Sequence, residues 1–158
     1  MTQKTNPSHT PSGPLVRVKD LRVAFGDPKD PENATEAIKG VSLDIGKGET
    51  VALVGESGSG KSVTAMSMLK LLPGSAIIKD GSSVTFDGDE LTTANNAKLR
   101  TIRGNRVSVI FQEPMTSLNP VHNIGKQIAE VVMHHKKCSK RQANIRTLEL
   151  LEQVGIPN

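Results

Sequence analysis

The chain has 158 residues with a formal net charge of +4, and its residues are 23% charged and 35% hydrophobic. This length suffices for one domain with its own core, and the charge is too small to argue for nucleic acid as a partner. A single cysteine, Cys138, excludes an internal disulfide and fits a reducing compartment. Neither a membrane span nor a secretory signal is predicted, so we expect any link to a membrane to run through partner proteins.

Three strands are expected in the N-terminal third of the chain. Residues 1–14 contain three prolines and no apolar cluster, which predicts a disordered tail. Apolar residues over 15–25 predict a strand, a loop rich in Pro and Asp follows over 26–36, and a second strand is expected over 38–45. Val51–Val54 is apolar on both faces, which is typical of a strand buried in a parallel sheet.

A glycine-rich segment follows directly, Gly55-Glu56-Ser57-Gly58-Ser59-Gly60-Lys61-Ser62. Its glycines free the backbone so that N–H groups can turn toward phosphate oxygens, and the helix expected over 61–72 directs its positive end there. Lys61 can reach the β- and γ-phosphates, and the Ser62 hydroxyl can bind Mg²⁺. The segment therefore predicts a phosphate-binding P-loop for a nucleoside triphosphate, namely ATP with Mg²⁺.

The second half of the chain predicts two short strands and two helices. Strands are expected over Ser83–Phe86, before an Asp87-Gly88 turn, and over Val107–Phe111, before an irregular loop. One face of the first helix is formed by Ile124, Ile128, Val131 and His135. The second helix is expected to begin at a Ser139 cap and to stop at Gly155.

Two segments together carry a family resemblance. The P-loop segment GESGSGKSVTAMSMLKLLP, followed by VIFQEPMTSLNP over 109–120, resembles the ATPase subunits of ABC transporters, and among them the peptide/nickel importer group. The resemblance implies an α/β fold, the P-loop NTPase core of an ABC nucleotide-binding domain with an N-terminal antiparallel β portion. After the tail over 1–14, it implies a partial nucleotide-binding core over 15–122 and the start of a helical subdomain over 123–158.

The resemblance also implies roles for two residues outside the P-loop. The family's glutamine at the place of Gln112 contacts Mg²⁺ or the attacking water, so Gln112 is expected to act in catalysis with Lys61 and in metal binding with Ser62. The family stacks an aromatic ring on adenine at the place of Phe25, for which ordinary core packing is the equal alternative. The remaining nucleotide contacts are expected from Gly55, Glu56, Ser57, Gly58, Ser59 and Gly60.

Three elements that the family uses for hydrolysis are not found in this sequence: an LSGGQ-type signature, an apolar strand ending in Asp-Glu, and a switch histidine. Val84–Glu90 imitates the second, but its Asp-Gly is better interpreted as a turn. We therefore expect the chain to be the first half of a longer ATPase. Alone, it should be marginally stable and hydrolyse ATP negligibly.

The function implied is that of an ATP-binding subunit that energises transport of peptides or similar small solutes. Implied partners are transmembrane permease subunits, a second ATPase subunit and, indirectly, a solute-binding protein, at the cytoplasmic face of the cell membrane; nucleic acid is not among them. A soluble ATP-binding module without transport activity and a small P-loop kinase are the alternatives. A metal site at His134, His135 and Cys138 lacks a fourth ligand, so a solvated helix end is the better interpretation.

Overall fold

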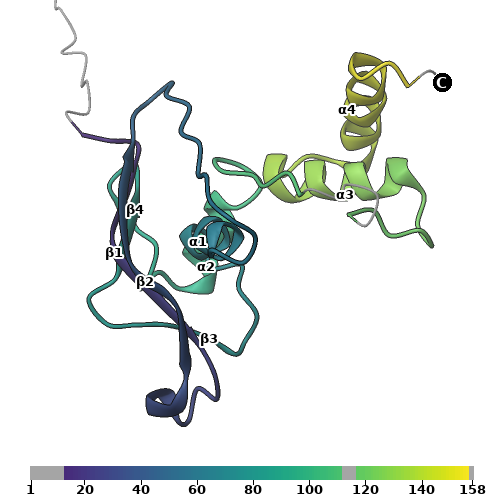
Figure 1. Ribbon diagram of the computed structural model, residues 1–158. Coiled ribbons are helices and arrows are strands. Elements are labelled where there is room, and N and C mark those ends of the chain that lie inside the picture. The colour runs from purple at the N-terminus through teal and green to yellow at the C-terminus, as the bar shows by residue number, and fades with distance from the viewer. Residues whose placement is uncertain (1–12, 112–116, 157–158) are drawn as a thin grey trace, which may run out of the picture. The chain divides into compact units, whose positions relative to one another are not determined.

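The computed structural model describes residues 13–111 and 117–156. The chain divides between Leu99 and Arg100 into two compact units, and Figure 1 labels most of their helices and strands. No helix in these described ranges combines the length and hydrophobicity that a membrane span requires.

The first unit is built on a five-stranded sheet whose main path runs β2-β1-β4-β5, and all its pairings are antiparallel. The strands are β1 (Val16–Phe25), β2 (Thr35–Ile45), β3 (Ala76–Ile78), β4 (Ser83–Phe86) and β5 (Asp89–Glu90). One edge of β1 pairs with β2, and the other edge is divided between β4 and β3. The strands expected over 15–25, 38–45 and 83–86 are confirmed, and a short 3-10 helix, η1 (Pro31–Asn33), lies in the expected loop.

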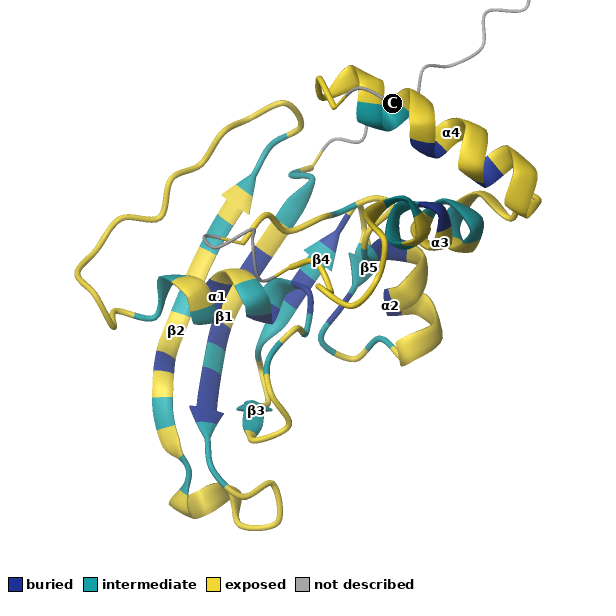
Figure 2. Cartoon of the chain, turned by 90° about the vertical axis from the view of Figure 1, so that its right-hand side faces the viewer, coloured by how far each residue is buried: buried dark blue, intermediate teal, exposed yellow. Residues whose placement is uncertain are grey.

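The buried face of β1 changes halfway along the strand. Val18 is buried, and then Leu21 and Val23 are fully buried, so the buried residues change from an even position to odd ones after Asp20. Ala24 is fully buried as well, at a further irregularity in the pairing. The change coincides with an irregularity in the pairing and with Asp20, whose φ is +44°. This irregularity keeps apolar side chains inward on both halves of the strand. The dark bands in Figure 2 show that the core lies along β1 and β4.

Helix α1 (Lys61–Met68) packs on β1 and β2 (Figure 2). It is shorter than the helix expected over 61–72, because the chain leaves helical geometry after Met68 and Lys70 adopts a φ of +50°. In this left-handed conformation the Lys70 ammonium donates hydrogen bonds to the carbonyl oxygens of Thr92 (2.8 Å) and Ala94 (3.4 Å). Lys70 thus ties the end of α1 to the segment after β5.

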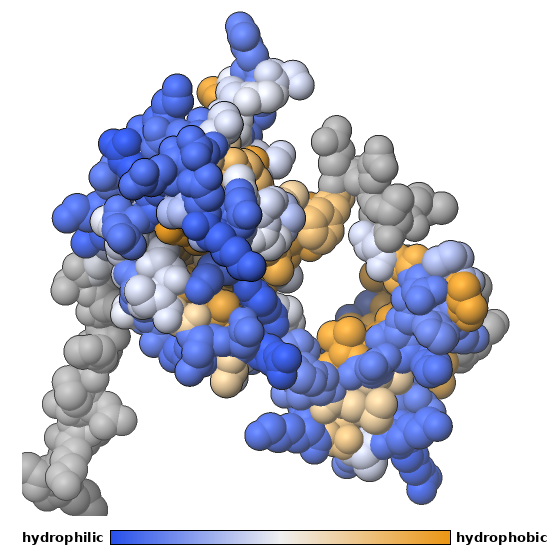
Figure 3. Space-filling view, turned by 90° about the horizontal axis from the view of Figure 1, so that it is seen from below, coloured by the Kyte–Doolittle hydropathy of each residue, from blue (hydrophilic) through white to orange (hydrophobic). Residues whose placement is uncertain are grey.

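Two expected strands are not formed. Val51–Val54 is irregular and Val54 is 89% exposed, and the described residues of 107–111 contain only a bridge between Arg103 and Val107, with Ile110 94% exposed. A strand needs a neighbour for its N–H and C=O groups, and no described segment forms a ladder with either stretch. Figure 3 shows that hydrophobic residues lie among hydrophilic ones on the face in view.

The second unit contains α3 (Ile124–Lys136) and α4 (Lys140–Gln153), which pack against each other, while α2 (Asn96–Ile102) spans the division between the units. Both helices expected here are confirmed. Asn123 caps α3, and Ser139 caps α4 in a reciprocal capping box with Gln142. Small residues form the buried face of the pair, namely Ala129, Ala143 and Thr147.

Candidate functional site

The glycine-rich segment forms an exposed loop that leads into α1. Gly58 and Gly60 have φ values of +80° and +87°, in a region that only glycine enters without strain. Gly60 is the N-cap of α1, and the first turn of that helix contains no acidic residue. The loop therefore has the backbone geometry that lets successive N–H groups converge, beside the positive end of a helix.

Lys61 closes this loop from the inside. Its Nζ donates hydrogen bonds to the carbonyl oxygens of Gly55 (2.8 Å) and Glu56 (2.7 Å) and to Oγ of Ser59 (3.3 Å). The side chain therefore bridges the start and the end of the loop. A positive charge is therefore held within the loop, beside the start of α1, which is an arrangement suited to an anion with several oxygens.

Two hydrogen bonds to the carbonyl oxygen of Gly60 fix the first turn of α1. The carbonyl oxygen of Gly60 accepts hydrogen bonds from the backbone N–H (2.8 Å) and the Oγ1–H (3.0 Å) of Thr64. The N–H groups of Lys61, Ser62 and Val63 precede this first helical bond, and N–H groups at such positions have no partner within their own helix. Ser62 is exposed, so its hydroxyl is accessible to a metal ion or a phosphate oxygen.

The other predicted site residues are placed differently. Phe25 is half-buried at the end of β1, where it pairs with Thr35 of β2 and Ala76 of β3. It belongs to the same unit as the P-loop, and its stacking on adenine stays a prediction. Gln112 lies outside the described residues, so its catalytic and metal-binding roles also stay predictions.

The Asp87-Gly88 pair forms the tight turn that the sequence indicates. Both residues have positive φ values, +50° and +83°, and they connect β4 to β5. This conformation is typical of a two-residue hairpin turn. The acidic residues after it therefore belong to a hairpin, and Val84–Glu90 is not the apolar strand ending in Asp-Glu that hydrolysis needs.

Glu90 stabilises that hairpin with both carboxylate oxygens. Oε1 accepts hydrogen bonds from Val84 N (3.1 Å), Thr92 N (2.9 Å) and Thr92 Oγ1 (2.7 Å), and Oε2 accepts one from Ser83 Oγ. Burial by itself would raise the pKa of Glu90, but these hydrogen bonds together lower that pKa below its ordinary value. At neutral pH the carboxylate is therefore ionised, and both of its oxygens accept hydrogen bonds.

Sequence reasoning missed the residues that support the loop. Thr64 and Ser67 are buried on α1, and Ile38 of β2 is 3% exposed beneath its start. Both buried hydroxyls donate to a backbone carbonyl four residues earlier, a pattern that lets Ser and Thr enter a helix interior.

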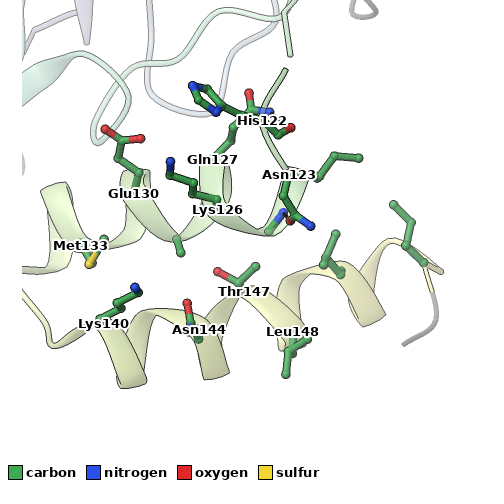
Figure 4. A pocket seen from close by; sticks show the side chains of 15 residues that line it. His122, Asn123, Lys126, Gln127, Glu130, Met133, Lys140, Asn144, Thr147 and Leu148 are labelled. Atoms are coloured by element: carbon green, nitrogen blue, oxygen red, sulfur yellow. Dashed lines mark hydrogen bonds between the residues drawn. The ribbon is translucent and has the colours of Figure 1, made fainter. Parts of the chain in front are cut away.

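A groove in the second unit is lined by α3 and α4 (Figure 4). Glu130, Lys126 and Met133 reach it from α3, and Asn144 and Leu148 from α4. None of the predicted nucleotide ligands lines this groove. Nearby, the rings of His134 and His135 meet edge to face with centroids 4.9 Å apart, and no cluster of three or more His, Cys, Asp and Glu residues suited to a metal occurs within the described ranges.

Comparisons with known proteins agree with this geometry. A family model described as ABC transporter matches residues 38–158. The peptidoglycan transport ATP-binding protein YejF of Agrobacterium fabrum is 51% identical over 148 residues, covering 93% of this chain and 26% of the relative. The oligopeptide transport ATP-binding protein OppD of Bacillus subtilis is 46% identical over 143 residues, covering 90% of this chain and 39% of the relative. The chain therefore spans less than half the length of these relatives.

A solved structure supports the fold. A dimeric ATP-binding cassette in a post-hydrolysis state, bound to ADP and Pi, aligns with a TM-score of 0.67 and 23% sequence identity. The alignment covers 87% of this chain and 56% of that chain. The expected fold class, an α/β P-loop nucleotide-binding domain that is present in part, is confirmed.

Proposed function

The chain belongs to the ABC transporter family, and from this membership we propose that it binds ATP through Gly55–Ser62 as part of a transport ATPase. The observation that carries the proposal is the P-loop, in which two left-handed glycines, the Lys61 ammonium and the start of α1 converge. Such a cradle fits a chain of phosphates because each element supplies a donor or a positive charge.

The proposed roles of the P-loop residues follow from their chemistry, and those of Gln112 and Phe25 follow from the family resemblance. The loop N–H groups would hold phosphate oxygens, Lys61 would neutralise charge at the β- and γ-phosphates, and the exposed Ser62 hydroxyl would bind Mg²⁺. When bound, the ion adds positive charge beside the phosphates. Gln112 would orient the attacking water or bind the ion, and Phe25 would stack on the adenine.

The transported solute and the partners are proposed from the relatives. Proteins similar to this chain are named for transport of oligopeptides, dipeptides and peptidoglycan. We therefore propose peptides or similar small solutes as cargo. Permease subunits, a second ATPase subunit and, indirectly, a solute-binding protein would be the partners at the cytoplasmic face of the cell membrane.

The binding proposal is tested by titrating the purified chain with a fluorescent ATP analogue, with and without Mg²⁺. Saturable binding that ATP displaces, and that Lys61→Ala weakens, would support it. Absence of saturable binding would refute it. Because the sequence lacks the signature, the Asp-Glu strand and the switch histidine, the chain alone should release phosphate no faster than the Lys61→Ala variant.

The transport proposal needs a separate test. The chain would be co-expressed with the permease subunits of a peptide importer from the same genome and purified through a tag on the permease. Stable recovery of the chain supports the transport role. ATP binding without any permease association would instead favour a soluble ATP-binding module.

A further inference from the structure

A side chain of β2 lies directly against the last glycine of the P-loop. A Cβ added to Gly60 would collide with Cδ1 of Ile38, while the carbonyl oxygen of Ala37 (3.5 Å) and Cγ1 of Ile38 (3.9 Å) would stay at ordinary contact distances. Ile38 is buried, so a displaced side chain would have to repack against its neighbours in the core. A single methyl group of Ile38 therefore occupies the space that a side chain at position 60 would need.

A bulge in β2 sets the direction of the Ile38 side chain. Val23 of β1 pairs with Ile38, and the next residue, Ala24, pairs with Glu36, so Ala37 is an extra residue in β2. A bulge of this kind bends the strand and changes the direction of neighbouring side chains. The residue after the bulge is the one that contacts the P-loop.

We propose that Ile38 is a positioning residue for the phosphate-binding loop, and this proposal rests on the proposed ATP site. By supporting Gly60, which caps α1, Ile38 sets the place of the N–H groups in the helix's first turn. The same strand pair carries Phe25, which pairs with Thr35 three residues from Ile38. The β1–β2 pair therefore determines how far the proposed adenine contact lies from the proposed phosphate contacts.

Gly58 offers a matched control for this contact. Its φ of +80° is close to the +87° of Gly60, so alanine suffers the same backbone strain at both positions. A Cβ at Gly58, however, meets no atom within 4 Å. The two glycines differ in steric contact with Ile38 and hardly at all in backbone conformation.

The test combines Gly58→Ala and Gly60→Ala, each alone and with Ile38→Val, which removes the colliding Cδ1 and keeps a buried aliphatic side chain. We measure the dissociation constant of the full 158-residue chain for a fluorescent ATP analogue with Mg²⁺, and the melting temperature of each variant. Gly58→Ala should weaken binding by about tenfold through backbone strain alone. Gly60→Ala should weaken it by about another tenfold through the collision.

The decisive result is selective rescue. Ile38→Val should recover about tenfold in affinity for Gly60→Ala and nothing for Gly58→Ala. Equal rescue of both glycine variants, or rescue of neither, would overturn the proposal. If the parent chain binds no ATP, the proposed function fails, and the melting temperatures of the variants then test the Ile38 contact. An effect of Ile38→Val that differs between the Gly60→Ala and Gly58→Ala backgrounds supports the contact. Additive effects of the substitutions on the melting temperature would overturn it.

Discussion

The Nζ of Lys61 donates a 2.7 Å hydrogen bond to the carbonyl oxygen of Glu56, five residues earlier in the chain. With a second bond to the carbonyl oxygen of Gly55, it converts an exposed segment into a closed loop. The same side chain is therefore expected to hold the loop's shape and to provide its charge for phosphate.

Replacing Lys61 with alanine should weaken ATP binding by at least about tenfold, because charge-assisted hydrogen bonds are worth about 1.5–3 kcal/mol each. Equilibrium titration with a fluorescent ATP analogue measures the change. Lys47→Ala is the matched control, since it removes the same charge from an exposed turn between β2 and the P-loop. The Lys47 variant should stay within about twofold of the parent, and equal losses in both variants would show that only overall charge matters.

The stability of the first unit should depend on the ionisation of Glu90. Hydrogen bonds lower its pKa in the folded chain below the ordinary value of 4.5, despite partial burial. The stability that this carboxylate contributes is complete above the unfolded-state pKa and is lost as pH falls through the folded-state pKa. The melting temperature of the parent should therefore fall more steeply between about pH 5 and pH 3 than that of Glu90→Gln.

At neutral pH the Glu90→Gln variant should be less stable by about 1 kcal/mol, because its amide forms weaker hydrogen bonds with Ser83 and Thr92. Glu32→Gln removes an identical charge from an exposed position in η1 and serves as the control. Parallel pH profiles for the parent and the Glu90 variant would contradict the prediction.

The turn between β4 and β5 should be sensitive to substitution of Gly88. Its φ of +83° makes Gly88→Ala destabilising by about 1–2 kcal/mol, although no atom obstructs the added Cβ. Gly74 is equally unobstructed and has no positive φ, so Gly74→Ala should be neutral or stabilising by up to about 1 kcal/mol. Chemical denaturation of both variants gives the comparison, and equal effects would exclude backbone strain as the cause.

The start of α4 should depend on Ser139. Its side chain accepts a hydrogen bond from Gln142 N (3.3 Å), and its own N–H donates to Gln142 Oε1 (3.0 Å). Ser139→Ala should destabilise the helix by about 1 kcal/mol, whereas Ser139→Asn should retain most of its stability. Amide hydrogen exchange at Gln142 reports the loss directly, and unchanged protection in the alanine variant would contradict the capping role.

Local patterns in the sequence predict the antiparallel strands and the two C-terminal helices. Ser139 and Gly155 are strong signals because a cap and a left-handed stop need specific residue types, and the structure places them at the two ends of α4. The Asp87-Gly88 turn is predictable for the same reason. The P-loop is equally recognisable, since its glycines, lysine and serine have a fixed spacing.

Other features depend on contacts between distant residues. Val51–Val54 satisfies the pattern of a buried strand, but a strand forms only where a partner completes its hydrogen bonds. The contact between Ile38 and Gly60 joins positions 22 residues apart, and no spacing rule connects them. A signal for the irregularity in β1 was present, since its apolar residues change from Val16 and Val18 to Leu21 and Val23.

The irregular pairing of β1 and β2 also bears on how the two strands find each other during folding. A regular strand pair can slide by two residues and still bury the same faces. Here the register shifts at three places, and Gly40, with a φ of +93°, lies beside Asp20. Any slipped pairing would separate the irregular positions of β1 from the matching irregular positions of β2. The strand pair should therefore have one stable alignment and few long-lived misaligned intermediates.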